Sequence, residues 1–167
     1  INGKIINNVH HKSDNFITIN RGTKNGVSTE MAVINNKGVI GITDNVGPKF
    51  SRVQSILNSN SKINASFKNS NYFGTLIWDG KDYNITQLTD IPRQANFKIG
   101  DTIITGGRST IFPKGIPIGT VASIPEKLSA TNTINIKLFN DMANLGHIYI
   151  ITNLNKKEIK TVENKNE

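Results

Sequence analysis

Short apolar segments of four to eight residues, rich in isoleucine, valine and threonine, recur along the whole chain. Gly, Asn, Asp or Pro residues separate these segments. Several segments alternate between apolar and polar residues, as in INIKLF, where Ile134 and Ile136 fall on one face and Lys137 on the other. The periodicity of an amphipathic helix is almost absent. The pattern therefore predicts an all-β fold, either a sandwich or a barrel.

The segments define twelve candidate strands. They lie near residues 4–9, 15–20, 30–35, 38–46, 50–57, 62–68, 72–78, 84–90, 102–106, 116–124, 133–139 and 147–152. The stretch 51–57 is also compatible with a short helix. NNKG at 35–38 predicts a tight hairpin turn, and WDGKD at 78–82 predicts another.

A weak internal repeat indicates how these strands are grouped. NKGVIGIT (36–43) resembles PKGIPIGTV (113–121), and in both a Lys-Gly pair opens a strand that carries a second glycine, Gly41 or Gly119. A glycine inside a strand marks a bulge, a barrel corner or a close approach of two backbones. We therefore expect two tandem small β-barrels of about six strands each, which hide their strand edges by closure.

The boundaries of the two barrels follow from composition. A polar stretch near 59–64 separates a first barrel, residues 1–62, from a second barrel, residues 63–154. The tail 155–167 is charged and aperiodic, so we expect it to be disordered or to act as a tether.

Bulk composition excludes several classes of protein. The chain lacks cysteine, so it has neither disulfides nor thiolate metal sites. No apolar run approaches the length of about 20 residues that a membrane helix needs, and no signal peptide is visible. Because the first residue is not methionine, we expect a fragment or a processed chain from which a membrane anchor could have been removed.

The net charge of +8 is concentrated in the first half, where residues 1–65 carry eight basic and three acidic side chains. A basic surface can meet nucleic acid, anionic lipid or an acidic partner, or can simply keep the protein soluble. The aromatic residues are scattered about one per strand, as in a core, and form no strip interleaved with basic residues. A module that binds single-stranded nucleic acid is therefore only the alternative interpretation.

The densest run of glycine and proline, GGRSTIFPKGIPIGT (106–120), carries a candidate nucleophile, Ser109. It lacks the G-x-S-x-G elbow of hydrolases and the G-D-S-G-G string of chymotrypsin-type proteases. It also lacks the G-x-x-x-x-G-K-[ST] pattern of a phosphate-binding loop, and Pro113 blocks a helix there. We therefore interpret Ser109 as a turn residue.

No metal or cofactor site is expected. The histidines are His10, His11 and His147, and the first two are neighbours that point to opposite faces of a strand. Asp79 and Asp82 flank a turn glycine, so turn capping explains them better than acid–base chemistry. No catalytic or metal-binding motif is therefore recognisable in the sequence.

The remaining residues of the run are apolar or prolines. Pro117 lacks an N–H group, which places it at a strand start, a bulge or an edge. Phe112 and Ile116 bring apolar surface into a segment that the prolines hold extended. Two interpretations stay open, namely a packed loop that seals a barrel end and a surface that receives a partner segment.

The run also carries a family resemblance. GDTIITGGRSTIFPKGIPIGTV (100–121) resembles the F-P-x-G-I-P-[IV]-G-x-V segment of the bacterial rod-shape-determining MreC family. FITINRGTKNGVSTEMAVINNKGVIGIT (16–43) is similar to an earlier family segment, and NYFGTLIWDGKD (71–82) to its central part, especially in Bacteroidetes-type members. Two departures are Glu30, where many members have glycine, and Gly106, where many have serine.

The resemblance implies two tandem barrels on the periplasmic face of the inner membrane, anchored in the full-length protein by an N-terminal helix followed by a dimerising coiled coil. It implies a non-enzymatic scaffold of the cell-elongation machinery. The implied partners are a class B penicillin-binding protein, RodA, MreD and MreB, together with homodimers or higher self-assemblies. Our candidate residues for a partner or self-association surface are Tyr72, Phe73, Phe112, Pro113, Ile116 and Pro117.

Overall fold

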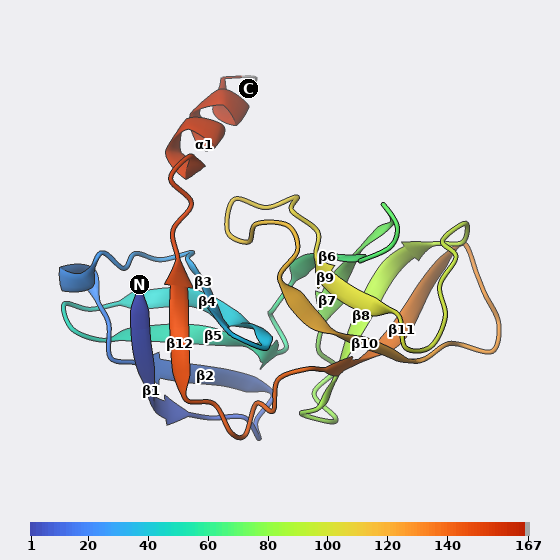
Figure 1. The fold of residues 1–167 in the computed structure, drawn as a ribbon, viewed down its shortest axis with the longest axis horizontal. Helices are drawn as coiled ribbons and strands as arrows, with labels where there is room; N and C mark the ends of the chain where they lie inside the picture. The colour runs from blue at the N-terminus through green and yellow to red at the C-terminus, as the bar shows by residue number, and fades with distance from the viewer. Residues whose placement is uncertain (166–167) are drawn as a thin grey trace.

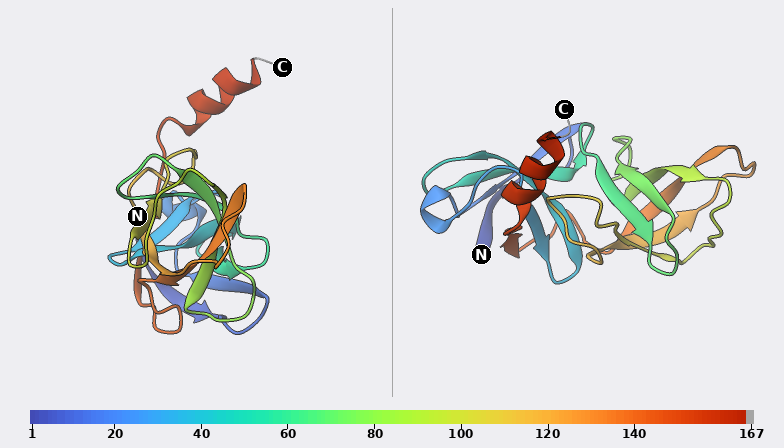
Figure 2. Two further views of the ribbon diagram at one scale, coloured as in Figure 1. Left: turned by 90° about the vertical axis from the view of Figure 1, so that its right-hand side faces the viewer. Right: turned by 90° about the horizontal axis from the view of Figure 1, so that it is seen from above.

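The computed structural model describes residues 1–165 and contains two closed six-stranded antiparallel barrels that lie side by side (Figure 1). Around its wall, the first barrel consists of β1 (Asn2–Asn8), β12 (His147–Ile151), β3 (Ala32–Asn35), β4 (Gly38–Val46), β5 (Ser51–Asn58) and β2 (Asp14–Ile19). The second consists of β10 (Pro117–Ser123), β11 (Thr131–Leu138), β8 (Ile85–Pro92), β7 (Phe73–Ile77), β6 (Ile63–Phe67) and β9 (Thr102–Thr105). Two short helices, η1 (Thr23–Asn25) and α1 (Lys156–Asn164), complete the elements. Figure 2 shows the second barrel end-on and the pair from above.

The predicted all-β fold of two six-stranded barrels is confirmed. Each of the twelve expected strands is present within a few residues of its predicted bounds. The segment left open at 51–57 is strand β5. Asn35 pairs with Gly38 across the expected NNKG turn, and the second expected turn, 78–82, lies between β7 and β8.

The domain boundary must be corrected at its C-terminal side. Residues 63–154 were expected to form the second barrel, but β12 belongs to the first, where Tyr149 pairs with Asn2 of β1 and Ile34 of β3. Figure 1 shows β12 beside β1, although most of the chain separates them in sequence. Without β12 the strands β1 and β3 would both present unpaired edges, and closure removes these edges.

The tail also differs from the expectation of disorder. Residues 156–164 form helix α1, which leaves the end of β12 and projects from the barrels (Figure 1). The ammonium groups of Lys156 and Lys160 each lie 3.1 Å from the Glu30 carboxylate. Glu30 adopts a left-handed backbone with φ of 59°, which suits the glycine that many family members have at this position. Residues 166–167 lie outside the described part, and no helix within residues 1–165 is long and apolar enough to cross a membrane.

Acidification is expected to loosen α1 from the first barrel. Hydrogen bonds from Lys160 and Lys156 lower the pKa of Glu30 below its ordinary value. The contribution of this ion pair is therefore complete above the ordinary pKa and is lost as the pH falls through the lowered one. We expect the α1 amides to be less protected from hydrogen exchange at acid pH, relative to the intrinsic exchange rate at that pH, and less protected at neutral pH in Glu30→Gln, with less than about 1 kcal/mol change in global stability. Glu126→Gln is the control. The prediction would be contradicted if the protection of the α1 amides changed neither with pH nor in Glu30→Gln.

Glycines allow neighbouring strands of each barrel to approach one another closely. A Cβ atom on Gly41 would overlap the carbonyl oxygen of Gln54, and one on Gly119 would lie 2.8 Å from the carbonyl carbon of Lys137. These are the equivalent glycines of the internal repeat. Of the three roles expected for these glycines, namely a bulge, a barrel corner or a close backbone approach, both show the close approach.

The two barrels meet where the turn between β3 and β4 reaches the start of β10. A Cβ atom on Gly38 would lie 2.9 Å from the carbonyl carbon of Pro117. The Asn35 carboxamide donates a 2.7 Å hydrogen bond to Asn140 in the connection between β11 and β12. Buried apolar side chains of both barrels form one continuous cluster. These contacts fix the turn against the second barrel.

Candidate interaction surface

The loop between β9 and β10, residues 106–116, is held in place by Thr105 at the end of β9. The Thr105 hydroxyl donates a 2.6 Å hydrogen bond to the Pro113 carbonyl and accepts one of 2.9 Å from the Ile116 N–H. The Thr105 backbone also exchanges hydrogen bonds with Gly115 and Ile116. The loop is therefore a rigid structure that folds back on its own strand.

Ser109 is a turn residue, as the sequence predicted. Its hydroxyl oxygen accepts hydrogen bonds from the backbone N–H groups of Ile111 (2.9 Å) and Phe112 (3.3 Å). Among residues 1–165, no group of three or more His, Asp or Glu side chains is arranged to hold a metal ion.

Glycine is required at both positions at the start of the loop, but for different reasons. A Cβ atom on Gly106 would lie 2.8 Å from the ring of Phe73 and would overlap the Asn64 carboxamide. Gly107 has φ of 82°, in the left-handed region that favours glycine.

The structure divides the predicted surface residues of the loop. Phe112 is only 2% exposed and belongs to the core cluster, so its expected place on a partner surface is wrong in this structure. Ile116 is half-buried against the core. Pro113 and Pro117 are exposed, and Pro117 begins β10 with a register shift before Gly119, as expected of a proline at a strand start or bulge.

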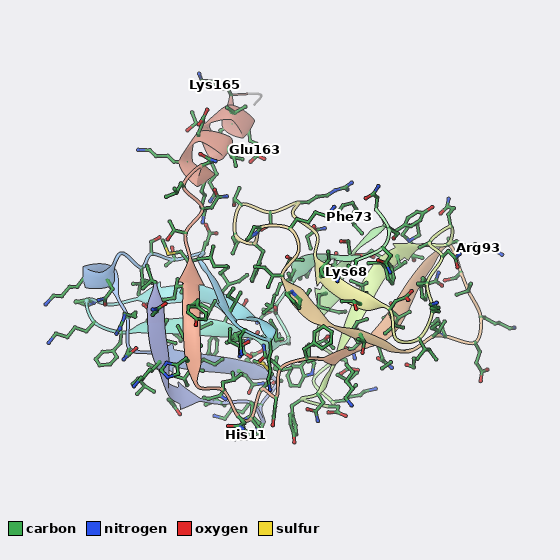
Figure 3. The ribbon with its side chains drawn as sticks, in the orientation of Figure 1. His11, Lys68, Phe73, Arg93, Glu163 and Lys165 are labelled. Atoms are coloured by element: carbon green, nitrogen blue, oxygen red, sulfur yellow. The ribbon has the colours of Figure 1, made fainter. Side chains whose placement is uncertain are left out.

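Tyr72 and Phe73 lie at the start of β7, beside the loop. Tyr72 is 37% exposed, and the half-buried ring of Phe73 carries the Arg108 guanidinium 3.8 Å above its centroid. Figure 3 shows Phe73 on the same side of the second barrel as the loop. We call Tyr72, Phe73, Arg108 and Pro113 the loop surface. Arg108 had no predicted role, because only the fold brings its guanidinium over Phe73.

A groove separates this loop from the end of β12 and α1. A cavity of about 390 Å³ has apolar side chains, including Met31, Ile111 and Ile151, and a rim of lysines that includes Lys157. A second cavity of about 340 Å³ continues past Pro113. The arrangement, an apolar floor with a basic rim beside a rigid loop, is suited to binding another protein segment.

The aromatic residues only partly follow the expectation that they are core residues. Phe67, Trp78 and Phe112 are buried. Five others are more than a third exposed, namely Phe50, Tyr72, Tyr83, Phe139 and Tyr149. These exposed rings lie on both barrels.

Comparisons with known proteins agree in one family. The family model described as Rod shape-determining protein MreC, barrel core, matches residues 5–152. The cell shape-determining protein MreC of Listeria monocytogenes is 29% identical over 155 residues, which cover 90% of this chain and 52% of that protein. The chain thus spans about half the length of the relatives it matches.

Solved structures give the same answer for the fold. The structure of MreC from Listeria monocytogenes matches with a TM-score of 0.82 and 28% identity, over 92% of this chain and 75% of that one. A solved complex between a penicillin-binding protein (PBP2) and MreC from Helicobacter pylori matches with a TM-score of 0.62 and 16% identity, over 80% of this chain and 85% of that one. The second likeness concerns the fold alone.

Proposed function

Because the chain belongs to the MreC family of cell shape-determining proteins, we propose that it is the extracytoplasmic part of a scaffold for peptidoglycan synthesis during cell elongation. The scaffold has no catalytic activity of its own. It binds and positions a class B penicillin-binding protein and assembles with RodA, MreD, MreB and further copies of itself. In the whole protein an N-terminal helix holds it at the periplasmic face of the inner membrane.

The rigid loop between β9 and β10 is the observation that carries this proposal. The Thr105 hydroxyl donates a hydrogen bond to the Pro113 carbonyl, and the Ser109 hydroxyl accepts one from the Ile111 N–H. These bonds hold the loop in place, while Tyr72, Arg108 and Pro113 remain accessible. A preformed surface loses little conformational entropy when a partner binds. It can therefore favour one arrangement of a bound synthase over another. The solved MreC–PBP2 complex from Helicobacter pylori supports a partner of this class.

Truncation of the loop surface is expected to weaken synthase binding without unfolding the barrels. We expect Tyr72→Ala and Arg108→Ala each to weaken binding to the elongation-specific class B penicillin-binding protein about tenfold, because aromatic and arginine side chains dominate interface energies. Biolayer interferometry with the purified synthase measures the change. Phe50→Ala removes an exposed aromatic ring from the first barrel and should leave affinity unchanged.

The outcomes separate the loop surface from other sites and other functions. Equal affinities for Tyr72→Ala, Arg108→Ala and the unmodified chain would move the contact elsewhere on the protein. Absence of any interaction with the synthase would overturn the proposed function. For the alternative, a nucleic-acid module, an electrophoretic shift with mixed oligonucleotides should appear at low salt and fall steeply as salt rises.

A further inference from the structure

A polar cavity of about 390 Å³ lies on the first barrel, away from the loop surface. Its lining residues come from the turn between β3 and β4, the connection between β11 and β12, and strand β12 itself. They are Asn35, Asn36, Lys37, Asn140, Asn144, Gly146, His147 and Tyr149. The volume falls within the range of about 300–1,000 Å³ that is usual for small-molecule sites. The cavity is therefore large enough to hold a small molecule.

Two of its four carboxamides form a fixed floor. Asn140 is 4% exposed, accepts a 2.7 Å hydrogen bond from Asn35, and donates one of 3.3 Å to the carbonyl of Val39. The Asn35 side-chain oxygen in turn accepts hydrogen bonds from the N–H groups of Lys37 and Gly38. Since Gly38 is packed against Pro117 of the second barrel, the floor is held from both barrels.

The rim carries exposed polar groups and one aromatic face. The side chains of Asn36 and Asn144 are exposed, and each carboxamide can both donate and accept hydrogen bonds. Tyr149 is 46% exposed on the outer face of β12, between Asn2 of β1 and Ile34 of β3. An exposed ring at the edge of a carboxamide-lined cavity can pack against the C–H face of a ligand while the amides bind its polar groups.

The lining narrows the class of ligand. Among the described residues, none that lines the cavity carries a carboxylate, which disfavours cations as ligands. Lys37 is its one permanently charged lining side chain, which is too little for a phosphate-rich ligand. Polar and apolar surface are mixed in the lining, and its side chains other than Tyr149 are amides, a lysine and a histidine, so the cavity has no continuous apolar wall for a lipid chain.

We propose that this cavity binds a neutral oligosaccharide. Sugar hydroxyl and acetamido groups both donate and accept hydrogen bonds, as the asparagine side chains do, and a sugar ring presents C–H groups that suit the Tyr149 face. Asn35 belongs to the first barrel, and Asn140 lies in the connection that leaves the second barrel. A bound sugar would therefore contact the place where the two barrels join. This activity is separate from synthase binding at the loop surface.

The test is a titration of the isotope-labelled chain, residues 1–167, with chitotetraose, cellotetraose and maltotetraose, followed by amide NMR shifts. We expect saturable shifts around Asn36, Asn144 and Tyr149 with at least one of these sugars. A preference for chitotetraose would assign the contact to acetamido groups, and binding of the others would assign it to hydroxyls. Tyr149→Ala is expected to weaken binding about tenfold. Asn144→Ala is expected to weaken binding as well.

Tyr72→Ala is the matched control, because it removes an exposed tyrosine from the second barrel and should leave the titration unchanged. Tyr149 lies on the outer face of a strand, so the spectrum of Tyr149→Ala should remain that of a folded protein. Failure of all three sugars to shift any lining residue at millimolar concentration overturns the proposal. Shifts that persist unchanged in both Tyr149→Ala and Asn144→Ala overturn it as well.

Discussion

Gly119→Ala is expected to destabilise the second barrel by about 3 kcal/mol. A Cβ atom at this position would lie 2.8 Å from the carbonyl carbon of Lys137 and would overlap its oxygen. Both atoms belong to the backbone of β11, so no side-chain rotation relieves the clash. Strands β10 and β11 would have to separate, although Gly119 pairs directly with Leu138 in the wall of the barrel.

Chemical denaturation followed by tryptophan fluorescence measures this effect. The single tryptophan, Trp78, is 6% exposed and lies next to β7, so it reports on the second barrel. Gly146→Ala is the control, because nothing lies within 4 Å of a Cβ atom built there. Gly119→Ala should lower the midpoint far more than Gly146→Ala, and equal midpoints would show that the close approach of the strands is not what requires glycine.

Features of the fold that depend on local sequence could be predicted, and the pair of glycines Gly41 and Gly119 is one example. Gly41 and Gly119 were paired through a short repeat, and both lie where two strands come too close for a side chain. Strands themselves were predictable for the same reason: alternation and turn residues are local features. In β11, for example, the apolar residues Ile134, Ile136 and Leu138 occupy buried positions and the polar residues between them are exposed.

Features that depend on distant segments were not predictable. Strand β12 follows the second barrel in sequence but closes the first, and no local pattern marks which edge a strand will join. The segment that forms helix α1 was expected to be disordered or to act as a tether, since its charges resemble those of a solvated tail. Its Lys160 pairs with Glu30, which lies 130 residues away. Only the folded chain brings these groups together.

The candidate surface was predicted in part for a related reason. An apolar residue between glycines and prolines has the same sequence signature whether it seals a barrel or faces a partner. Within the loop, Phe112 proved to be buried and Pro113 to be accessible, because the hydrogen bonds of Ser109 and Thr105 set the direction of the chain. Tyr72, just before β7, is also accessible. Arg108 joined the surface only through its contact with Phe73.

Because Phe112 is buried, truncation of its side chain is expected to destabilise the protein. We expect Phe112→Ala to lower the free energy of unfolding by about 3–5 kcal/mol, the usual range for removing a buried phenylalanine ring. Domains of this size have a total stability of about 5–15 kcal/mol, so the variant should lose a large fraction of its stability. Phe112→Leu keeps most of the apolar volume and should lose about 1.5 kcal/mol or less. Circular dichroism and Trp78 fluorescence during denaturation measure both variants.

Binding measurements on the same variants distinguish a core residue from a contact residue. If Phe112 acts only through the core, Phe112→Ala loses stability and synthase binding together, and Phe112→Leu recovers both. Tyr72→Ala should show the opposite pattern, with weakened binding and an unchanged denaturation midpoint, because its ring is exposed. A folded Phe112→Ala protein with the original midpoint but no binding would instead place the ring in the interface. That result would mean that the loop opens and exposes Phe112 when the partner binds.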